Sequence, residues 1–176
     1  MLQEREVQIL PGFSKKNYDW AVDTQTALQE IGRINSTIVC WPHWSTGNVE
    51  KDWIEKEANR IGKEVRDSHI NILAKSVGTM VAMELLKNSI QVDKLILCGI
   101  PIEDFQEDSR ERYQALHNFD INKVLLLQND KDPHGSPDQV RSLVKKINPA
   151  INIIIKSGDH HEYPYVEDFV SFLSQK

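Results

Sequence analysis

Six short runs of apolar residues recur along this chain, and none of them alternates with polar residues. Runs of this length, rich in Ile, Leu and Val, are typical of strands that are covered on both faces. The runs are Val7–Leu10, Thr37–Trp41, Ile70–Leu73, Leu95–Cys98, Val124–Leu127 and Ile151–Ile155. Stretches with helical spacing separate them, and such alternation means parallel strands joined by right-handed crossovers. The sequence therefore predicts an α/β fold, a three-layer α/β/α sandwich around a six-stranded parallel sheet.

The clearest helical pattern covers Val49–Val65, where apolar residues fall on one face at steps of three and four. Val77–Leu86 is apolar nearly all round, so this helix is expected to be buried. Pro137–Ile147 begins with Ser136 and Pro137 as cap and first-turn residues. The remaining helical candidates are Trp20–Ile34, Glu103–Phe119 and Tyr165–Leu173.

Length and composition limit the chain to one domain and exclude several function classes. With 176 residues and no repeat or linker-like stretch, residues 1–176 are expected to form a single domain. A net charge of -5 without a dense basic run predicts no nucleic-acid or anionic-lipid partner. No apolar run approaches the ~20 residues that span a membrane. Both cysteines lie in apolar runs and the N-terminus lacks a signal-peptide pattern, so a cytoplasmic location is expected, while the oligomeric state is left open.

Three residue types that nucleophilic catalysis requires follow three different predicted strands. In an open α/β sheet, ligands bind beyond the carboxyl ends of the strands. Ser76 follows the third apolar run, Asp132 the fifth and His160 the sixth. A serine becomes an effective nucleophile when a histidine takes its proton, and an acid orients that histidine. The chain order Ser–Asp–His, which is the hydrolase order, predicts a catalytic triad of these three residues.

The segment around Ser76 carries the most information. Ser76 lies at a strand-to-helix turn with Ala74 two residues before it and Gly78 two residues after it. A nucleophile elbow needs small residues at these positions because strand and helix pack closely there. The start of the helix would also favour developing negative charge. The alternative is a buried serine that caps an ordinary helix.

Each of the other two triad positions has an adjacent competitor. Asp130 precedes Asp132 in the loop after the fifth run, where it would otherwise cap the turn. His161 follows His160 in the loop after the sixth run. The sequence favours Asp132 and His160 and leaves both alternatives open.

These motifs, from Pro11-Gly12-Phe13 to the His160 loop, resemble a small α/β-hydrolase without a lid, similar to short bacterial serine esterases and the dienelactone-hydrolase-like group. The resemblance implies that the backbone N–H groups of Phe13 and Val77 form the oxyanion hole. It also implies a sheet order of 2-1-3-4-5-6, with the two strands that usually come first in the family missing. Ala74 stands where the family usually has glycine, and Pro11 where it often has histidine.

The family's lid would fall between the fourth and fifth runs, where residues 102–123 leave room for one charged helix only. An open site is therefore expected, with Trp41, Trp44 and Phe105 as candidates to line the substrate pocket, since aromatic rings often line small-molecule pockets. The predicted function is a serine hydrolase that cleaves a small carboxylic ester or thioester without metal or organic cofactor. Acyl transfer to an acceptor other than water would use the same residues.

Two other classes of function remain as alternatives. The triplet Asp159-His160-His161, with Asp130 and Asp132, resembles the signature of a manganese-binding phosphoesterase family, because hard divalent ions favour carboxylates with histidine. That interpretation leaves the Ser76 turn unexplained. The second alternative is a hydrolase-fold domain that serves protein interaction without catalysis, because a fold alone does not establish function. No glycine-rich phosphate loop follows any of the runs, which argues against a nucleotide-binding domain.

Overall fold

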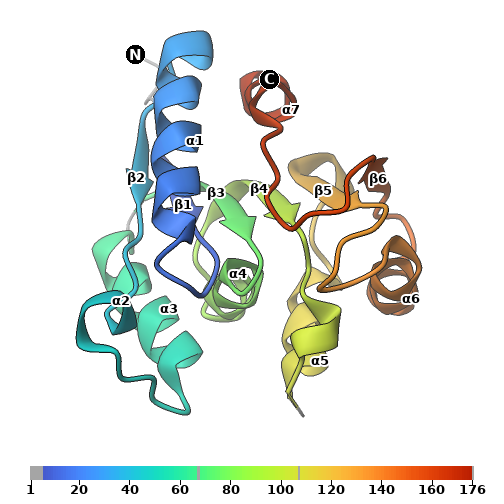
Figure 1. The fold of residues 1–176 in the computed structure, drawn as a ribbon, viewed down its shortest axis with the longest axis horizontal. Coiled ribbons are helices and arrows are strands. Elements are labelled where there is room, and N and C mark those ends of the chain that lie inside the picture. Colours follow the sequence, from blue (N-terminus) through green and yellow to red (C-terminus); the bar gives the residue numbers. More distant parts are fainter. Residues whose placement is uncertain (1–5, 67, 107, 176) are drawn as a thin grey trace.

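The sheet of this protein has six parallel strands in the order β2-β1-β3-β4-β5-β6, as predicted. The computed structural model describes residues 6–66, 68–106 and 108–175 and is shown in Figure 1. The strands match the predicted runs or extend them by at most three residues at either end, except that β2 ends at Ile38 and β6 begins only at Ile153. The strands are β1 Val7–Leu10, β2 Ser36–Ile38, β3 Ile70–Lys75, β4 Val92–Cys98, β5 Val124–Asn129 and β6 Ile153–Lys156.

Helices cover both faces of the sheet and create two separate apolar cores (Figure 1). One core lies under α1 (Asn17–Gly32) and α7 (Val166–Ser174). The other lies under α3 (Trp53–Glu64), α4 (Gly78–Lys87) and α6 (Pro137–Ile147). Successive residues of a strand point to opposite faces, so Leu73 joins the first core and Ala74 the second. This division explains why the strand runs show no polar alternation. Among the described residues, no helix combines the length and the apolar character needed to cross a membrane.

The order of strands creates a crevice at one place along the sheet. The helix that follows β1 covers one face, whereas the helix that follows β3 covers the other. Because β1 and β3 are neighbours in the sheet, the segments that leave their carboxyl ends diverge there. Such a switch point is where open α/β sheets bind ligands.

The expected single helix over Glu103–Phe119 is wrong. The structure divides this part into η1 (Ile102–Asp104), α5 (Ser109–Arg112) and η2 (Tyr113–Leu116), followed by η3 (Ile121–Lys123) before β5. Phe105 interrupts the helix with an extended backbone (ψ 132°), and its ring stacks on that of Tyr113 at 5.4 Å between centroids. The stacked pair of Phe105 and Tyr113 packs against the core, and for this reason the segment does not form one continuous helix. Similarly, the helix expected from Val49 begins only at Trp53, and the four-residue α2 (His43–Thr46) precedes it.

Arg112 holds this divided segment against two core helices. Its guanidinium forms ion pairs at 2.6 Å with Glu84 of α4 and with Glu55 of α3, and one at 3.2 Å with Asp108. The side chains of Arg112 and Glu84 are only 9% and 5% exposed, so their charges are largely withdrawn from water.

We expect Arg112→Met to lower the free energy of unfolding by about 3 kcal/mol, because removing one partner of a buried ion pair leaves the other charge unpaired. Chemical denaturation measures this loss. The matched control is Arg141→Met, since Arg141 pairs with the exposed Asp138 and such pairs contribute only ~0–1 kcal/mol. Equal losses in the two variants would contradict the assigned role of Arg112.

Candidate active site

Ser76 occupies a strained turn between β3 and α4. Its φ of +56° lies in the left-handed region, which non-glycine residues seldom adopt. The turn is fixed on one side by a hydrogen bond of 2.9 Å from the Ser76 N–H to the Cys98 carbonyl. On the other side Gly78 lies against β1, where an added Cβ would meet the Leu10 carbonyl oxygen at 2.1 Å. Strain of this kind at a strand-to-helix turn is the geometry of a nucleophile elbow.

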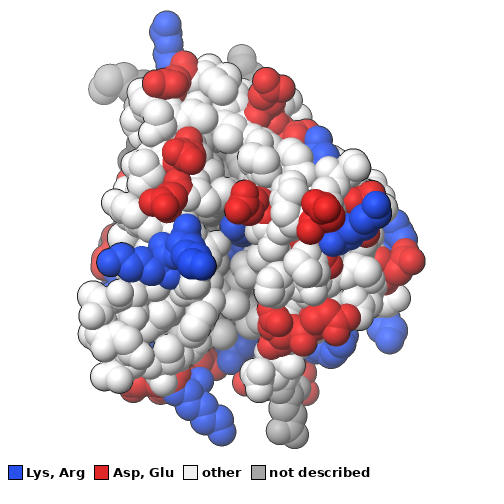
Figure 2. Space-filling view, in the orientation of Figure 1, with Lys and Arg blue, Asp and Glu red and all other residues white. Residues whose placement is uncertain are grey.

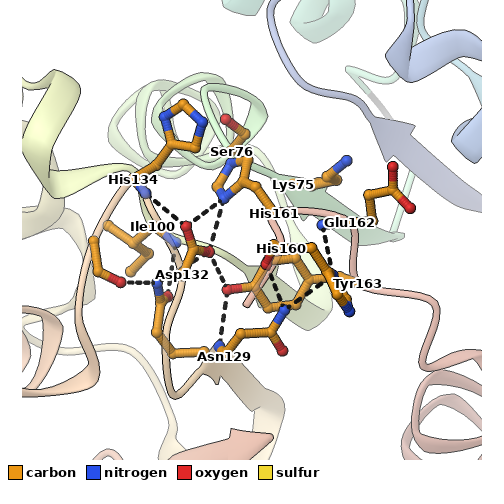
Figure 3. A network of polar contacts seen from close by, with 12 residues as sticks. Lys75, Ser76, Ile100, Asn129, Asp132, His134, His160, His161, Glu162 and Tyr163 are labelled. Atoms are coloured by element: carbon orange, nitrogen blue, oxygen red, sulfur yellow. Dashed lines mark hydrogen bonds and ion pairs between the residues drawn. The ribbon is translucent and has the colours of Figure 1, made fainter. Parts of the chain in front are cut away.

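Asp132 and His161 form a hydrogen-bonded pair at the same edge of the sheet (Figure 3). The Nδ1 atom of His161 lies 2.7 Å and 2.9 Å from the two carboxylate oxygens of Asp132. Tyr163 donates its hydroxyl to Asp132 Oδ2 at 2.6 Å, and the backbone N–H of His134 donates to Oδ1 at 2.8 Å. Burial opposes ionisation of Asp132, but these hydrogen bonds outweigh it and hold its pKa below the usual value. The carboxylate therefore stays charged and orients the imidazole.

The other ring nitrogen of His161 has no partner. Nε2 is buried and makes no hydrogen bond to any described residue. A hydrogen-bonded Nδ1 fixes the tautomer in which Nε2 can accept a proton. The ring packs over Gly99, next to the Cys98 carbonyl that holds Ser76. Ser76 and His161 thus flank the same end of β4, and no described residue occupies the hydrogen-bonding position of Nε2.

His160 does not lie where the sequence favours it. Asp132 bonds His161, whereas the Nδ1 atom of His160 accepts the Glu162 N–H at 3.3 Å. The His160 carbonyl is held by Asn129 Nδ2 at 2.8 Å, which fixes the direction of the backbone. Figure 3 shows that His161, and not His160, faces Asp132. The expected pairing of Asp132 with His160 is therefore corrected to a pairing with His161.

The other acidic competitor has a structural role. Asp130 accepts the Gly158 N–H at 2.8 Å and so joins the loops that follow β5 and β6. It makes no hydrogen bond to a histidine among the residues that the structure describes. Within the described ranges no three His, Cys, Asp or Glu side chains are grouped to hold a metal ion. The residues of the metal-dependent alternative, which are Asp130, Asp132, Asp159, His160 and His161, therefore do not form such a group.

The two backbone N–H groups that the resemblance assigns to the oxyanion hole belong to peptides whose carbonyls are fixed. The Nε1–H of Trp41 donates to the Gly12 carbonyl at 3.1 Å, and a trans peptide then directs the N–H of Phe13 the opposite way. The N–H and the hydroxyl of Thr79 donate to the Ser76 carbonyl at 2.9 and 2.6 Å, which orients the N–H of Val77 in the same manner. Neither N–H has a partner among the described residues, so both are available to bind an anion.

Of the three aromatic residues expected to line the pocket, Trp41 is buried in the core, whereas Trp44 and Phe105 are half-buried and pack against it. Trp41 is 1% exposed, which corrects its predicted place at the pocket mouth. Trp44 packs on the same core and donates its Nε1–H to the Phe13 carbonyl at 2.7 Å. Phe105 stacks on Tyr113, whose hydroxyl lies 2.6 Å from the Thr79 hydroxyl. Trp41 and Trp44 thus hold carbonyls of the loop after β1 directly, and Phe105 contacts the Ser76 turn through Tyr113 and Thr79.

A cleft of about 750 Å³ opens between α1 and the segment that precedes α7. His161 forms part of one wall, with Trp20 of α1 on the other side and Lys75, the residue before Ser76, also lining it. The sequence does not mark Trp20 and Lys75 as residues of a cleft. They belong to a helix and a strand whose periodicity indicates only core packing. His134 is also missed: its ring lies 4.3 Å from that of His161, and its Nδ1 lies 2.7 Å from Asp104 Oδ2.

The profile of the alpha/beta hydrolase domain family matches residues 47–169, more than half of the chain. Solved structures share the fold at low sequence identity. An alpha-beta serine hydrolase homologue from Coxiella burnetii is 16% identical with a TM-score of 0.69, over 97% of this chain and 84% of that one. XC6422 from Xanthomonas campestris, a serine hydrolase without a lid, is 14% identical with a TM-score of 0.69, over 98% and 80%. The esterase Pf2001 from Pyrococcus furiosus is 15% identical with a TM-score of 0.68, over 97% and 78%. No curated protein matches this chain in sequence.

Proposed function

Because the chain belongs to the alpha/beta hydrolase family, we propose that it is a serine hydrolase that cleaves a small carboxylic ester or thioester. The observation that carries the proposal is the Asp132–His161 pair, with a free Nε2, at the sheet edge where Ser76 sits in a strained turn. The fold is also that of an esterase from Pyrococcus furiosus and of a lidless serine hydrolase from Xanthomonas campestris. These likenesses support the fold and the class of reaction, and the triad assignment rests on this chain's own geometry.

In the proposed reaction, Ser76 Oγ attacks the acyl carbonyl while His161 Nε2 takes the hydroxyl proton. The charge that develops on the carbonyl oxygen is bound by the N–H groups of Phe13 and Val77. His161 then gives its proton to the leaving alcohol or thiol, which departs and leaves an acyl-enzyme. A water molecule, deprotonated by His161, attacks this ester, and the proton returns to Ser76 as the carboxylic acid leaves. Asp132 stabilises the imidazolium at both steps. The sequence of steps requires no metal or organic cofactor.

A fluorophosphonate probe tests the proposal, since it reacts with activated serines. We expect the wild type to be labelled and Ser76→Ala to be unlabelled, with turnover of p-nitrophenyl acetate lowered by at least about 10³-fold. Ser89→Ala is the matched control, because Ser89 also has a positive φ (+62°) but lies exposed at the far end of α4. Failure of the folded wild type to be labelled would overturn the proposed function.

A further inference from the structure

Lys75 is a buried cation without a carboxylate partner. It is 3% exposed, and it forms no ion pair with any described residue. Its ammonium donates to Asn17 Oδ1 at 2.9 Å and lies 5.0 Å from the centre of the Trp20 ring. An ammonium group has three donors, so these two contacts leave it incompletely satisfied. Buried charges in proteins are normally paired, and one that is not paired is free to bind an anion.

The charge of Lys75 matters because the residue lies next to Ser76 and lines the cleft. It ends β3 directly before Ser76, and it lines the cleft that His161 also lines. The close-up of the site shows its ammonium pointing away from Asp132, on the side of Glu162, with no ion pair drawn between the two (Figure 3). Ser76 itself is not among the residues that line the cleft, so its neighbour Lys75 and the base His161 connect the cleft to the nucleophile. A substrate that lies in the cleft and extends to Ser76 would therefore contact a buried positive charge.

The rim of the cleft carries more acidic than basic side chains, with the exposed Lys16 as its basic member. Figure 2 shows acidic side chains on both sides of the hollow between α1 and the segment before α7. They include Asp19, Asp23 and Glu162, all of them exposed. Exposed charges are weakened by water and salt, whereas a buried charge is screened much less. The interior of the cleft thus favours an anion more strongly than the rim opposes it.

We propose that the cleft beside His161 binds a carboxylate of the substrate, so that the preferred esters or thioesters carry a negative charge that Lys75 recognises. This inference rests on the proposed function, since the bound carboxylate belongs to the molecule that Ser76 attacks. An ammonium–carboxylate hydrogen bond in a partly dry site is among the stronger polar contacts in proteins. In this proposal Lys75, which directly precedes the nucleophile in the chain, also determines the specificity for the substrate.

The test compares charged and neutral esters in the wild type and in Lys75→Met. One pair is mono-p-nitrophenyl glutarate and p-nitrophenyl pentanoate, in which the charge lies on the acyl half. A second pair is 3-acetoxybenzoate and phenyl acetate, in which it lies on the leaving group. We expect Lys75→Met to lower the charged-to-neutral ratio of kcat/KM by about tenfold or more in one pair. The pair that responds identifies which half of the ester enters the cleft.

Two variants control the experiment. Lys75→Arg keeps the charge and is expected to retain more of the ratio than Lys75→Met does. Lys146→Met removes an exposed lysine on α6 and is expected to keep the wild-type ratio. If both ratios are unchanged in Lys75→Met, the inference is wrong. A parallel loss of activity toward charged and neutral esters would mean that Lys75 only positions Asn17.

The wild type provides a test that does not depend on a variant. Desolvation lowers the pKa of Lys75 to about 8, although Glu162 and Asp132 favour its charged form. We therefore expect the preference for charged esters to fall as the pH rises through about 8, because the ammonium loses its proton. Both esters are cleaved by the same catalytic groups, so the ratio removes effects of pH that the two reactions share. A constant ratio from pH ~6.5 to ~9.5 would overturn the inference. The other titratable groups near Lys75 are Lys16, Asp19, Asp23, Cys98, His160 and Glu162.

The outcome separates this inference from the proposed function. An enzyme that is labelled by the fluorophosphonate and cleaves neutral esters, but shows no charge preference, retains the proposed function and loses the inference. A folded protein that is neither labelled nor active loses both.

Discussion

Replacing His161 by Ala is expected to lower kcat/KM for p-nitrophenyl acetate by at least about 10³-fold, whereas His160→Ala keeps most of the activity. The reason is that His161 alone of the two bonds Asp132, and its free Nε2 can take the proton of Ser76. Among the described residues, His160 is hydrogen-bonded by the Glu162 N–H of its own loop and by the side-chain amide of Asn129. Steady-state kinetics of the two purified variants measure the difference.

Thermal melting of both variants is the control for folding, since each removes a side chain from the same loop. Asp132→Asn supplies a further check, because it keeps the size of the side chain but no longer stabilises the imidazolium. It should approach the loss seen for His161→Ala. If His160→Ala is inactive while His161→Ala is active, the assignment of the base is wrong.

The second large effect is expected from Gly78→Ala. A Cβ at this position would lie 2.1 Å from the Leu10 carbonyl oxygen and 2.8 Å from that of Pro11, so α4 or β1 must move. Overpacking of this kind costs about 1–3 kcal/mol or more, and here both contacts are backbone atoms that cannot rotate away. We expect the free energy of unfolding to fall by about 3 kcal/mol. Activity should fall by about 10²-fold, because the shift separates Val77 from Phe13. Denaturation and ester hydrolysis measure the two effects.

Gly62→Ala is the matched control for this prediction. Gly62 lies within α3, and a Cβ there would have its nearest neighbour, Ile90 Cδ1, at an ordinary 3.4 Å. Alanine is better than glycine inside a helix by about 1 kcal/mol, so this variant should be as stable as the wild type or more stable. A similar loss in both variants would show that close contact with β1 is not what requires glycine at position 78.

The sheet is predictable from the sequence because its strands are covered on both faces. The run Leu95–Cys98 has no polar residue because helices pack on both sides of it, and such runs indicate the class of fold. The helix Pro137–Ile147 is predicted to the residue, because Ser136 and Gln139 form a capping box at its start. The segment from Glu103 to Phe119 is not predictable in the same way. Its charges suggest an exposed helix, whereas Phe105 and Arg112 pack inward and divide it.

The site shows the same limit. Ser76 and its elbow can be found because Gly78 must approach β1, a local requirement that leaves a mark in the sequence. The choice between His160 and His161 depends on tertiary contacts, among them Asn129 and Tyr163, which come from distant or irregular segments. Nothing in the spacing of two adjacent histidines indicates which one faces Asp132. Likewise, a tryptophan just beyond a strand end looks equally suited to a pocket and to a core, and only packing places Trp41 in the core.

The hydrogen bonds donated by the Trp41 indole and the Thr79 hydroxyl bear on what must happen between substrate binding and attack. Each fixes the carbonyl of a peptide whose N–H we assign to the oxyanion hole, and each is itself held by buried neighbours. The dipoles that would receive the developing charge therefore already point the right way when the site is empty, and little reorganisation accompanies the reaction. An enzyme built in this way needs no closing movement between binding and attack. In the proposed mechanism, attack on the bound ester therefore does not wait for a lid to close.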